Sequence, residues 1–332
     1  MWAEQLKEAA AFIRDRDDFL IVSHVQPDGD AISSTVTVAW MLEKLGKRYT
    51  MLNEGAVPSR LRFLWKSSDI HAMDNNDQPE GNSPVRQYRN VICVDCADYA
   101  RVGRTEAWFA PDAELLNIDH HPTNNGFGRV NLMKFHAAAT AEILFELLDE
   151  LGMEPDADVA TAIYTGLLTD TGGFRYSSTS PLVMAMASRL LQAGANGPEL
   201  AEHLLERMTP GQLRILQRGL SRLELSEDER IAWLWVTSED LEETGATNED
   251  LEGLVNYPRN IEGVEVGLLF KQNGEQSVKV SMRSAGKVNV AEVAQRFGGG
   301  GHVRAAGCRF TDPLPEVIRL TIEEVRKALE AL

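Results

Sequence analysis

Cysteine is scarce in this chain of 332 residues, which contains only Cys93, Cys96 and Cys308. So few cysteines, and an odd number of them, cannot form the disulfide framework of a small secreted protein. Cys93 and Cys96 have C-x-x-C spacing, but no second pair accompanies them. We therefore expect both to pack in an apolar core rather than to bind a metal.

Long hydrophobic runs are also missing. No apolar run approaches the roughly 18 residues that a membrane-spanning helix needs. The first twenty residues place charges among their apolar positions, which is typical of neither a signal peptide nor a membrane anchor. We expect a soluble, cytoplasmic protein with no membrane partner.

Positive charge is under-represented. Lys and Arg number 33 against 50 Asp and Glu, which gives a formal net charge of -17. Long nucleic acids bind proteins mainly through cations that displace counterions, so a chain this acidic should repel a long polyphosphate. We therefore expect no long duplex nucleic acid as a partner, and a nucleic-acid role only for short single strands or through a local basic patch.

The composition is otherwise that of a globular protein, and at roughly 150 residues per domain the length predicts two domains. In the first half, short strands rich in Val, Ile and Leu alternate with helices, which is typical of a doubly wound α/β domain with a parallel sheet. Later strands alternate in part, which favours a smaller α/β domain with a mixed sheet. We expect the first domain over residues 1–190, a helical connector over 191–225 and the second domain over 226–332.

The expected elements follow from the apolar patterns. Strands are expected at 19–22, 49–52, 91–94, 115–118, 231–236, 264–271 and 278–282. Helices are expected at 31–45, 137–151, 158–168, 181–192, 201–225 with a break at 209–211, 290–297 and 315–332.

Four strand ends in the first domain carry residue types that bind metals. The four segments are SHVQPDGD (23–30), VDCAD (94–98), NIDHH (117–121) and LTD (168–170). The eight candidates are His24, Asp28, Asp30, Asp95, Asp119, His120, His121 and Asp170. Ligands of open α/β sheets bind outside the carboxyl ends of the strands, where we expect at least the first three segments.

The number and type of these residues indicate the chemistry. A catalytic zinc takes about three protein ligands, so eight candidates fit two ions better than one. Mixed imidazole and carboxylate ligands favour manganese, iron or cobalt over magnesium. Two ions roughly 3.5–4 Å apart can activate water and hold both oxygens of an in-line displacement at phosphorus. The sequence thus predicts hydrolysis of a phosphoester or phosphoanhydride.

The second domain contains a local excess of positive charge. The stretch 271–310 holds the basic residues Lys271, Lys279, Arg283, Lys287, Arg296, Arg304 and Arg309 and the acidic residues Glu275 and Glu292. Within it, four consecutive glycines, 298–301, can bring backbone amides close to an anion. A helix beginning after Gly301 would add the partial positive charge of its N-terminus.

These motifs together resemble a known family. The segments SHVQPDGDA, VDCAD, the Asp119-His120-His121 triplet and GLLTDTGGFRYS resemble the four motifs of the DHH phosphoesterase family. GGGGHVRAAG resembles the signature of its DHH-associated C-terminal domain. The resemblance covers nearly the whole chain and is strongest to the NrnA type. It implies a bifunctional enzyme that degrades RNAs of about two to five nucleotides and removes the 3′ phosphate from 3′-phosphoadenosine 5′-phosphate (pAp), usually with manganese.

The resemblance also implies a role for each residue. His24, Asp28 and Asp95 would hold one metal, and Asp30, Asp95, His120 and Asp170 the other, so Asp95 would bridge two Mn²⁺ ions. Asp119 would orient the neighbouring histidines, and His121 would face the substrate phosphate as hydrogen-bond donor or leaving-group acid. Arg283, Ser284, Gly299, Gly300, Gly301 and His302 would bind the rest of the nucleotide. The oligomeric state is left open, and the resemblance is compatible with a homodimer.

Four other functions share part of this pattern. A soluble cyclic-dinucleotide phosphodiesterase, or an enzyme that hydrolyses its linear product, would carry the same motifs. A manganese-dependent inorganic pyrophosphatase shares the four N-terminal motifs, but the GGGGH segment argues against it. A RecJ-type exonuclease would need further nucleic-acid-binding domains and a basic channel. A non-catalytic nucleotide sensor is disfavoured because every expected ligand position carries a competent residue.

Overall fold

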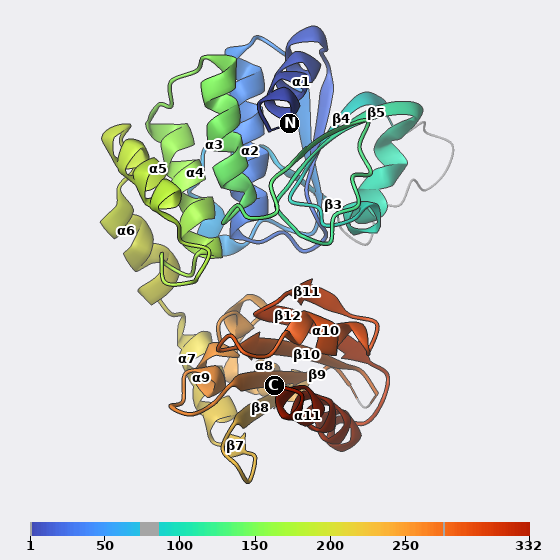
Figure 1. Ribbon diagram of the computed structural model, residues 1–332, viewed down its shortest axis with the longest axis vertical. Coiled ribbons are helices and arrows are strands. Elements are labelled where there is room, and N and C mark those ends of the chain that lie inside the picture. Colours follow the sequence, from blue (N-terminus) through green and yellow to red (C-terminus); the bar gives the residue numbers. More distant parts are fainter. Residues whose placement is uncertain (1, 74–85, 275) are drawn as a thin grey trace. The chain divides into compact units, whose positions relative to one another are not determined.

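The structure, a computed structural model, describes residues 2–73, 86–274 and 276–332. The chain forms two compact units, Met1–Arg207 and Met208–Leu332 (Figure 1). Glu275, one of the two acidic residues counted in the basic stretch, lies outside the described residues. Among the helices of the described part, none is long and apolar enough to span a bilayer.

A six-stranded parallel sheet forms the centre of the first unit, with strand order β3-β2-β1-β4-β5-β6. The strands are β1 (Phe19–Val22), β2 (Tyr49–Glu54), β3 (His71–Met73), β4 (Tyr88–Val94), β5 (Phe109–Asp119) and β6 (Val130–Met133). The direction of winding reverses between β1 and β4, where open α/β sheets leave a crevice at their carboxyl edge. The polar segments after β1, β4 and β5 begin at this edge. The expected parallel α/β fold is confirmed.

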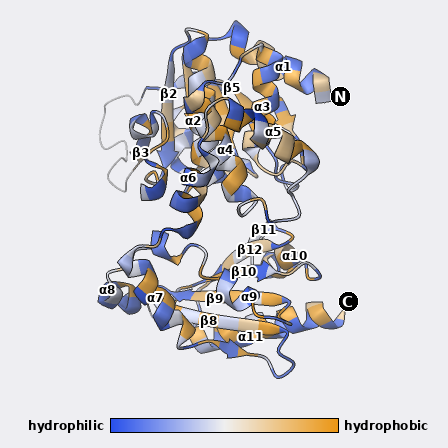
Figure 2. Cartoon of the chain, turned by 90° about the vertical axis from the view of Figure 1, so that its left-hand side faces the viewer, coloured by the Kyte–Doolittle hydropathy of each residue, from blue (hydrophilic) through white to orange (hydrophobic). Residues whose placement is uncertain are grey.

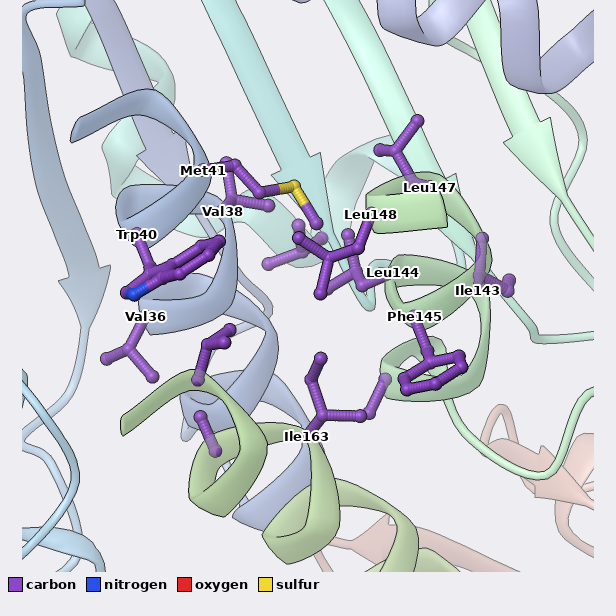
Figure 3. Close-up of a cluster of buried hydrophobic side chains, with 14 of the residues drawn as sticks. Val36, Val38, Trp40, Met41, Ile143, Leu144, Phe145, Leu147, Leu148 and Ile163 are labelled. Carbon is purple, nitrogen blue, oxygen red and sulfur yellow. The ribbon is translucent and has the colours of Figure 1, made fainter. Parts of the chain in front are cut away.

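Helices lie on one face of this sheet, the first three against the strands and the other three behind them, packed on helices. They are α1 (Trp2–Asp15), α2 (Gly29–Lys44), α3 (Thr140–Leu151), α4 (Ala157–Asp170), α5 (Pro181–Gln192) and α6 (Gly197–Ala201). Figure 3 shows Met41 of α2, Leu144 and Leu148 of α3 and Ile163 of α4 in the space between the helices, where all four are buried. Both α2 and α3 begin near the carboxyl edge of the sheet. Their first turns therefore lie beside the strand ends.

Among the residues that the structure describes, the opposite face of the sheet is covered by a 3₁₀ segment, η3 (Tyr99–Trp108), rather than by α-helices. Cys93 and Cys96 are fully buried in this layer, which confirms that they pack in the core.

The sequence pattern groups the fourth polar segment with the strand ends, but this segment follows the helix expected over 158–168, and that helix is confirmed as α4. Asp170 is the last residue of helix α4. Asp156 caps this helix by accepting a hydrogen bond from the backbone N–H of Val159. The cap and the packing of α4 on α2 favour a helix, so Asp170 approaches the strand ends from the helical layer.

The helix expected over 201–225 is interrupted as predicted. After α6 comes a single π-helical turn, η4 (Glu202–Glu206), and then α7 (Pro210–Leu220). The hydroxyl of Thr209 caps α7 by accepting the backbone N–H of Gln212. Residues Glu224–Leu225 form strand β7 instead of helix. Because Ile215 and Leu216 of α7 are buried against strand side chains of the second unit, α7 belongs to that unit. The expected connector over 191–225 is thus divided between the two units.

The second unit contains the mixed sheet that the sequence predicts. Its strand order is β11-β12-β10-β9-β8-β7, with β8 and β9 parallel and the other neighbours antiparallel. The strands after β7 are β8 (Ile231–Thr237), β9 (Val266–Gln272), β10 (Val278–Ser284), β11 (Gly300–His302) and β12 (Ala305–Phe310). The helices after α7 are α8 (Ser238–Thr244), α9 (Asn256–Arg259), α10 (Val290–Gln295) and α11 (Leu314–Glu330).

The helices of this unit pack on both faces of its sheet. The apolar side chains of α10 and α11 are buried on one face, and those of α7 on the other, over β8 and β9. Figure 2 shows hydrophobic and hydrophilic residues alternating along α11, as expected for an amphipathic helix with one buried side.

No helix begins directly after Gly301, so the positive helix end considered above is not available there. Gly300–His302 form the edge strand β11, which pairs with β12 through a tight turn. A Cβ atom on Gly299 would lie 2.2 Å from the carbonyl oxygen of Gly307, and one on Gly301 would lie 2.5 Å from that of Ala305. Gly301 also has a φ of 140°, which residues with a side chain rarely adopt. The glycines therefore allow β11 to lie close against β12.

Candidate metal centre

The candidate ligands of the first unit form overlapping groups. His24, Asp28 and Asp95 form one group, and Asp30, Asp95 and His120 form another; within each group the potential ligand atoms lie within 4.8 Å of one another. Asp170 adjoins the second group, because its Oδ2 lies 3.5 Å from Nε2 of His120. The two groups share Asp95.

Asp95 has an unusual backbone conformation. Its φ is 57°, in the left-handed region that Asp and Asn tolerate better than most other residues with a side chain. The buried carboxylate lies between the two groups, with Oδ2 3.5 Å from Nε2 of His24 and Oδ1 3.6 Å from Nε2 of His120. One carboxylate can therefore serve two metal positions.

The two histidines are oriented in the same way by different backbone carbonyls. Nδ1 of His24 lies 2.9 Å from the oxygen of Val25, and Nδ1 of His120 lies 3.1 Å from the oxygen of Ala137. A carbonyl only accepts hydrogen bonds, so each Nδ1 donates, and a neutral imidazole then keeps its lone pair on Nε2. Both Nε2 atoms face Asp95, which is the arrangement of metal-ligating histidines.

Asp30 is in the first turn of α2, and its fully buried carboxylate lies at the N-terminus of α3. Its Oδ2 accepts the backbone N–H of Thr140 at 2.6 Å, and its Oδ1 accepts that of Ala141 at 3.0 Å. Burial and the neighbouring carboxylates Asp95 and Asp28 raise the pKa of Asp30 well above its usual range. The amides and the positive end of the helix oppose this effect and hold the carboxylate in place.

The electrostatics of the site favour a cation. Burial disfavours a charged His24, but hydrogen bonds and Coulombic attraction from Asp28 and Asp95 overcome it and raise the pKa of His24 to about 10. Asp28 also caps α2 through the N–H groups of Asp30 and Ala31. The same carboxylates would attract a divalent ion, and the mixed imidazole and carboxylate donors fit such ions. The residues present therefore fit a metal centre.

Asp119 orients only one of the two histidines expected. Its Oδ1 lies 2.8 Å from Nδ1 of His121, whereas His120 is held by the carbonyl of Ala137. Asn124 donates to the other carboxylate oxygen of Asp119 at 2.7 Å and also to the carbonyl of Cys96. Asn124 could not be predicted, because no motif or spacing separates it from an ordinary loop asparagine.

In the second unit, two of the expected substrate residues share one face of the sheet. Arg283 of β10 pairs with Ala305 of β12, and Ala305 pairs in turn with His302 of β11. Ser284 points to the opposite face, is buried, and donates its hydroxyl to Glu265 at 3.1 Å. The structure therefore groups Arg283 with His302 but not with Ser284.

Comparison with known proteins agrees with this geometry. Residues 18–167 match the model of the DHH family N-terminal domain, and residues 230–331 match the DHHA1 domain. The chain is 35% identical over 93% of its length, and 89% of the relative, to the bifunctional oligoribonuclease and PAP phosphatase NrnA of Thermus thermophilus. It is 27% identical to the protein of that name from Bacillus subtilis, over 88% of each chain.

A solved structure shows the same fold. An exopolyphosphatase-related protein from Bacteroides fragilis superposes with a TM-score of 0.87 at 26% identity, covering 98% of this chain and 96% of that one. Together with the two domain matches and the 35% identity over most of the chain, this shows that the chain belongs to the DHH phosphoesterase family.

Proposed function

We propose that the chain is a two-metal phosphoesterase that hydrolyses oligoribonucleotides of about two to five nucleotides to mononucleotides and converts pAp to AMP. The observation that carries this proposal is the pair of donor groups that share Asp95. The substrate class is supported by the names of the relatives from Thermus thermophilus and Bacillus subtilis, which are oligoribonucleases and PAP phosphatases.

The proposed ligand sets follow the two donor groups, with manganese as the metal. His24, Asp28 and Asp95 would hold one ion, and Asp30, Asp95, His120 and Asp170 the other. Two such ions supply an activated water and charge stabilisation at phosphorus. The four carboxylates match the charge of two divalent ions, so the loaded centre is near neutral.

Other residues would bind and orient the substrate. Asp119 fixes the ring of His121, which would donate a hydrogen bond to the reacting phosphate or a proton to the leaving oxygen. Arg283 and His302 would bind a phosphate or base of the nucleotide that does not react. A guanidinium suits this task because it can form two parallel hydrogen bonds to phosphate.

The direct test is an assay of the purified protein with manganese on a dinucleotide, pAp, cyclic di-AMP and pyrophosphate. We expect turnover of the first two. Preferential hydrolysis of cyclic di-AMP would favour the cyclic-dinucleotide phosphodiesterase, and preferential hydrolysis of pyrophosphate would favour the pyrophosphatase. No turnover of any of the four would contradict the proposal.

Substrate length gives a second prediction. We expect a labelled RNA of two nucleotides to be hydrolysed faster than one of 24, because beyond the local basic stretch 271–310 a chain with a net charge of -17 gains little from contacts with further phosphates. The rates are compared at equal substrate concentration and ionic strength. A faster rate on the longer strand would indicate a RecJ-like enzyme instead.

Thr140 gives a third prediction, because it contacts two of the proposed ligands. Its hydroxyl donates to Oδ1 of Asp95 at 3.1 Å, and its backbone N–H donates to Asp30. Thr140→Val keeps the size and the backbone bond but removes the hydroxyl. Manganese affinity should then fall about tenfold, as is common when a group that orients a ligand is removed.

Calorimetric titration of the metal-free protein with manganese chloride measures this effect. Thr140→Ser should restore the affinity, because it restores the hydroxyl. Thr37→Val is the matched control: Thr37 is a buried threonine of α2 whose hydroxyl donates to the carbonyl of Ser33 at 2.7 Å, outside the donor groups. The assignment of Thr140 is wrong if its valine variant binds manganese as tightly as the control.

A further inference from the structure

Three cations lie side by side on the sheet of the second unit. Lys279 of β10 pairs directly with Lys271 of β9 on one side and with Arg309 of β12 on the other. Directly paired residues point to the same face, and neighbouring strands lie about 4.8 Å apart, so the three side chains leave the sheet within about 10 Å of one another. We call Lys271, Lys279 and Arg309 the cation row.

No acidic group compensates this row within the described residues. Lys279 and Arg309 are exposed, and neither forms an ion pair or a hydrogen bond there. Lys271 is half-buried and donates to the side-chain oxygen of Asn248. Burial and the positive charges of Lys279 and Arg309 lower the pKa of Lys271. Like charges directly opposite each other destabilise a strand pair, so a bound anion would relieve this repulsion.

The cation row shares a face with Arg283. Side chains alternate along β10, and Val278, Val280 and Met282 point to the face that α10 and α11 cover. Lys279 and Arg283 therefore both point to the opposite face. They lie four residues apart on one strand, a distance of about 13 Å.

We propose that the cation row is a second anion site, which binds a backbone phosphate of the same oligoribonucleotide whose non-reacting phosphate or base is bound by Arg283. This inference rests on the proposed function. A nucleic-acid strand advances about 3.4 Å per nucleotide when stacked and more when extended, so about 13 Å corresponds to roughly two to four nucleotides. A pentanucleotide would reach the cation row, whereas pAp and a dinucleotide would not.

The double variant Lys279→Ala with Arg309→Ala tests this proposal. Lys271 stays in place because its partly buried stem contributes to packing. We expect kcat/KM on a pentanucleotide to fall about tenfold, mainly through KM, while the values on a dinucleotide and on pAp change less than about twofold. The salt dependence of KM for the pentanucleotide should also become weaker, by about 0.7 in the log–log slope for each phosphate that the variant no longer neutralises.

The matched control is Arg319→Ala with Lys327→Ala. Both residues are on α11, which packs on the other face of the sheet, and the double change removes the same charge. We expect this control to leave the ratio of kcat/KM on the pentanucleotide to kcat/KM on the dinucleotide unchanged. Equal losses on both lengths in the cation-row variant, or no loss on either, would overturn the proposal.

Failure of the proposed function can be distinguished from failure of the anion site. If the wild-type protein hydrolyses no oligoribonucleotide, the proposed function is wrong, whatever the variants do. Fluorescence anisotropy of labelled pentaadenylate then tests the anion site by itself. Weaker binding by the cation-row variant than by the α11 control would support the site, and equal affinities would overturn it.

Discussion

Replacing Asp95 with alanine should lower the turnover of pAp and of a dinucleotide by about a thousandfold or more, which corresponds to about 4 kcal/mol of transition-state stabilisation. The reason is that Asp95 belongs to both donor groups, so its replacement removes a donor from each proposed metal position. Turnover is measured with manganese in excess, and bound manganese per chain by mass spectrometry. We expect clearly less than two ions per chain.

A second variant separates charge from folding. Asp95→Asn keeps the shape of the side chain and tolerates the left-handed φ of 57°, so it should fold normally but bind the metals poorly. Asp156→Asn is the control, since Asp156 caps α4 outside the donor groups and Asn is an equally good cap. Two manganese ions per chain and near-normal turnover in the Asp95 variants would show that Asp95 does not bridge.

Arg283→Ala should reduce kcat/KM on pAp and on dinucleotides by about a hundredfold while leaving both metal ions bound, because hydrogen bonds between charged groups contribute about 1.5–3 kcal/mol each. The guanidinium stands on β10 with Gly267 and Ala305 as its directly paired neighbours, so small residues flank it on both sides. His302→Ala should act in the same direction.

The substrate bis-p-nitrophenyl phosphate distinguishes binding from chemistry. It has no second phosphate or nucleobase to anchor, so both variants should hydrolyse it at close to the wild-type rate. Arg283→Lys should recover only part of the loss on pAp, since an ammonium cannot form the paired hydrogen bonds of a guanidinium. Equal losses on both kinds of substrate would mean that Arg283 and His302 serve the reaction itself or the fold.

The elements and most candidate ligands could be predicted because their signals are local. The strand at residues 19–22 and the helix at 181–192 have the predicted bounds, since short apolar runs and a capping serine followed by proline identify them. The candidate ligands after β1, β4 and β5 could be predicted to converge, because parallel strands end at one edge of a sheet. The resemblance to the DHH family added the division into two metal positions.

Features that depend on contacts distant in sequence could not be predicted. Thr140 donates to Asp30 from 110 residues away, and this bond exists only because α3 begins beside the first strand end. The glycines at 298–301 suggested a loop, but Gly300 and Gly301 belong to the edge strand β11, which lies close against β12.

What the sequence determined by itself was therefore the class of fold, the family and the types of ligand, because hydrophobic periodicity and motif spacing are properties of short segments. The tertiary structure alone decided which groups orient those ligands and which charges stand together. The cation row shows the physical reason: its three members come from three strands, and a register shift of one residue between β9 and β10 would place Lys271 and Lys279 on opposite faces. Register is set by core packing across the whole sheet, which no single segment contains.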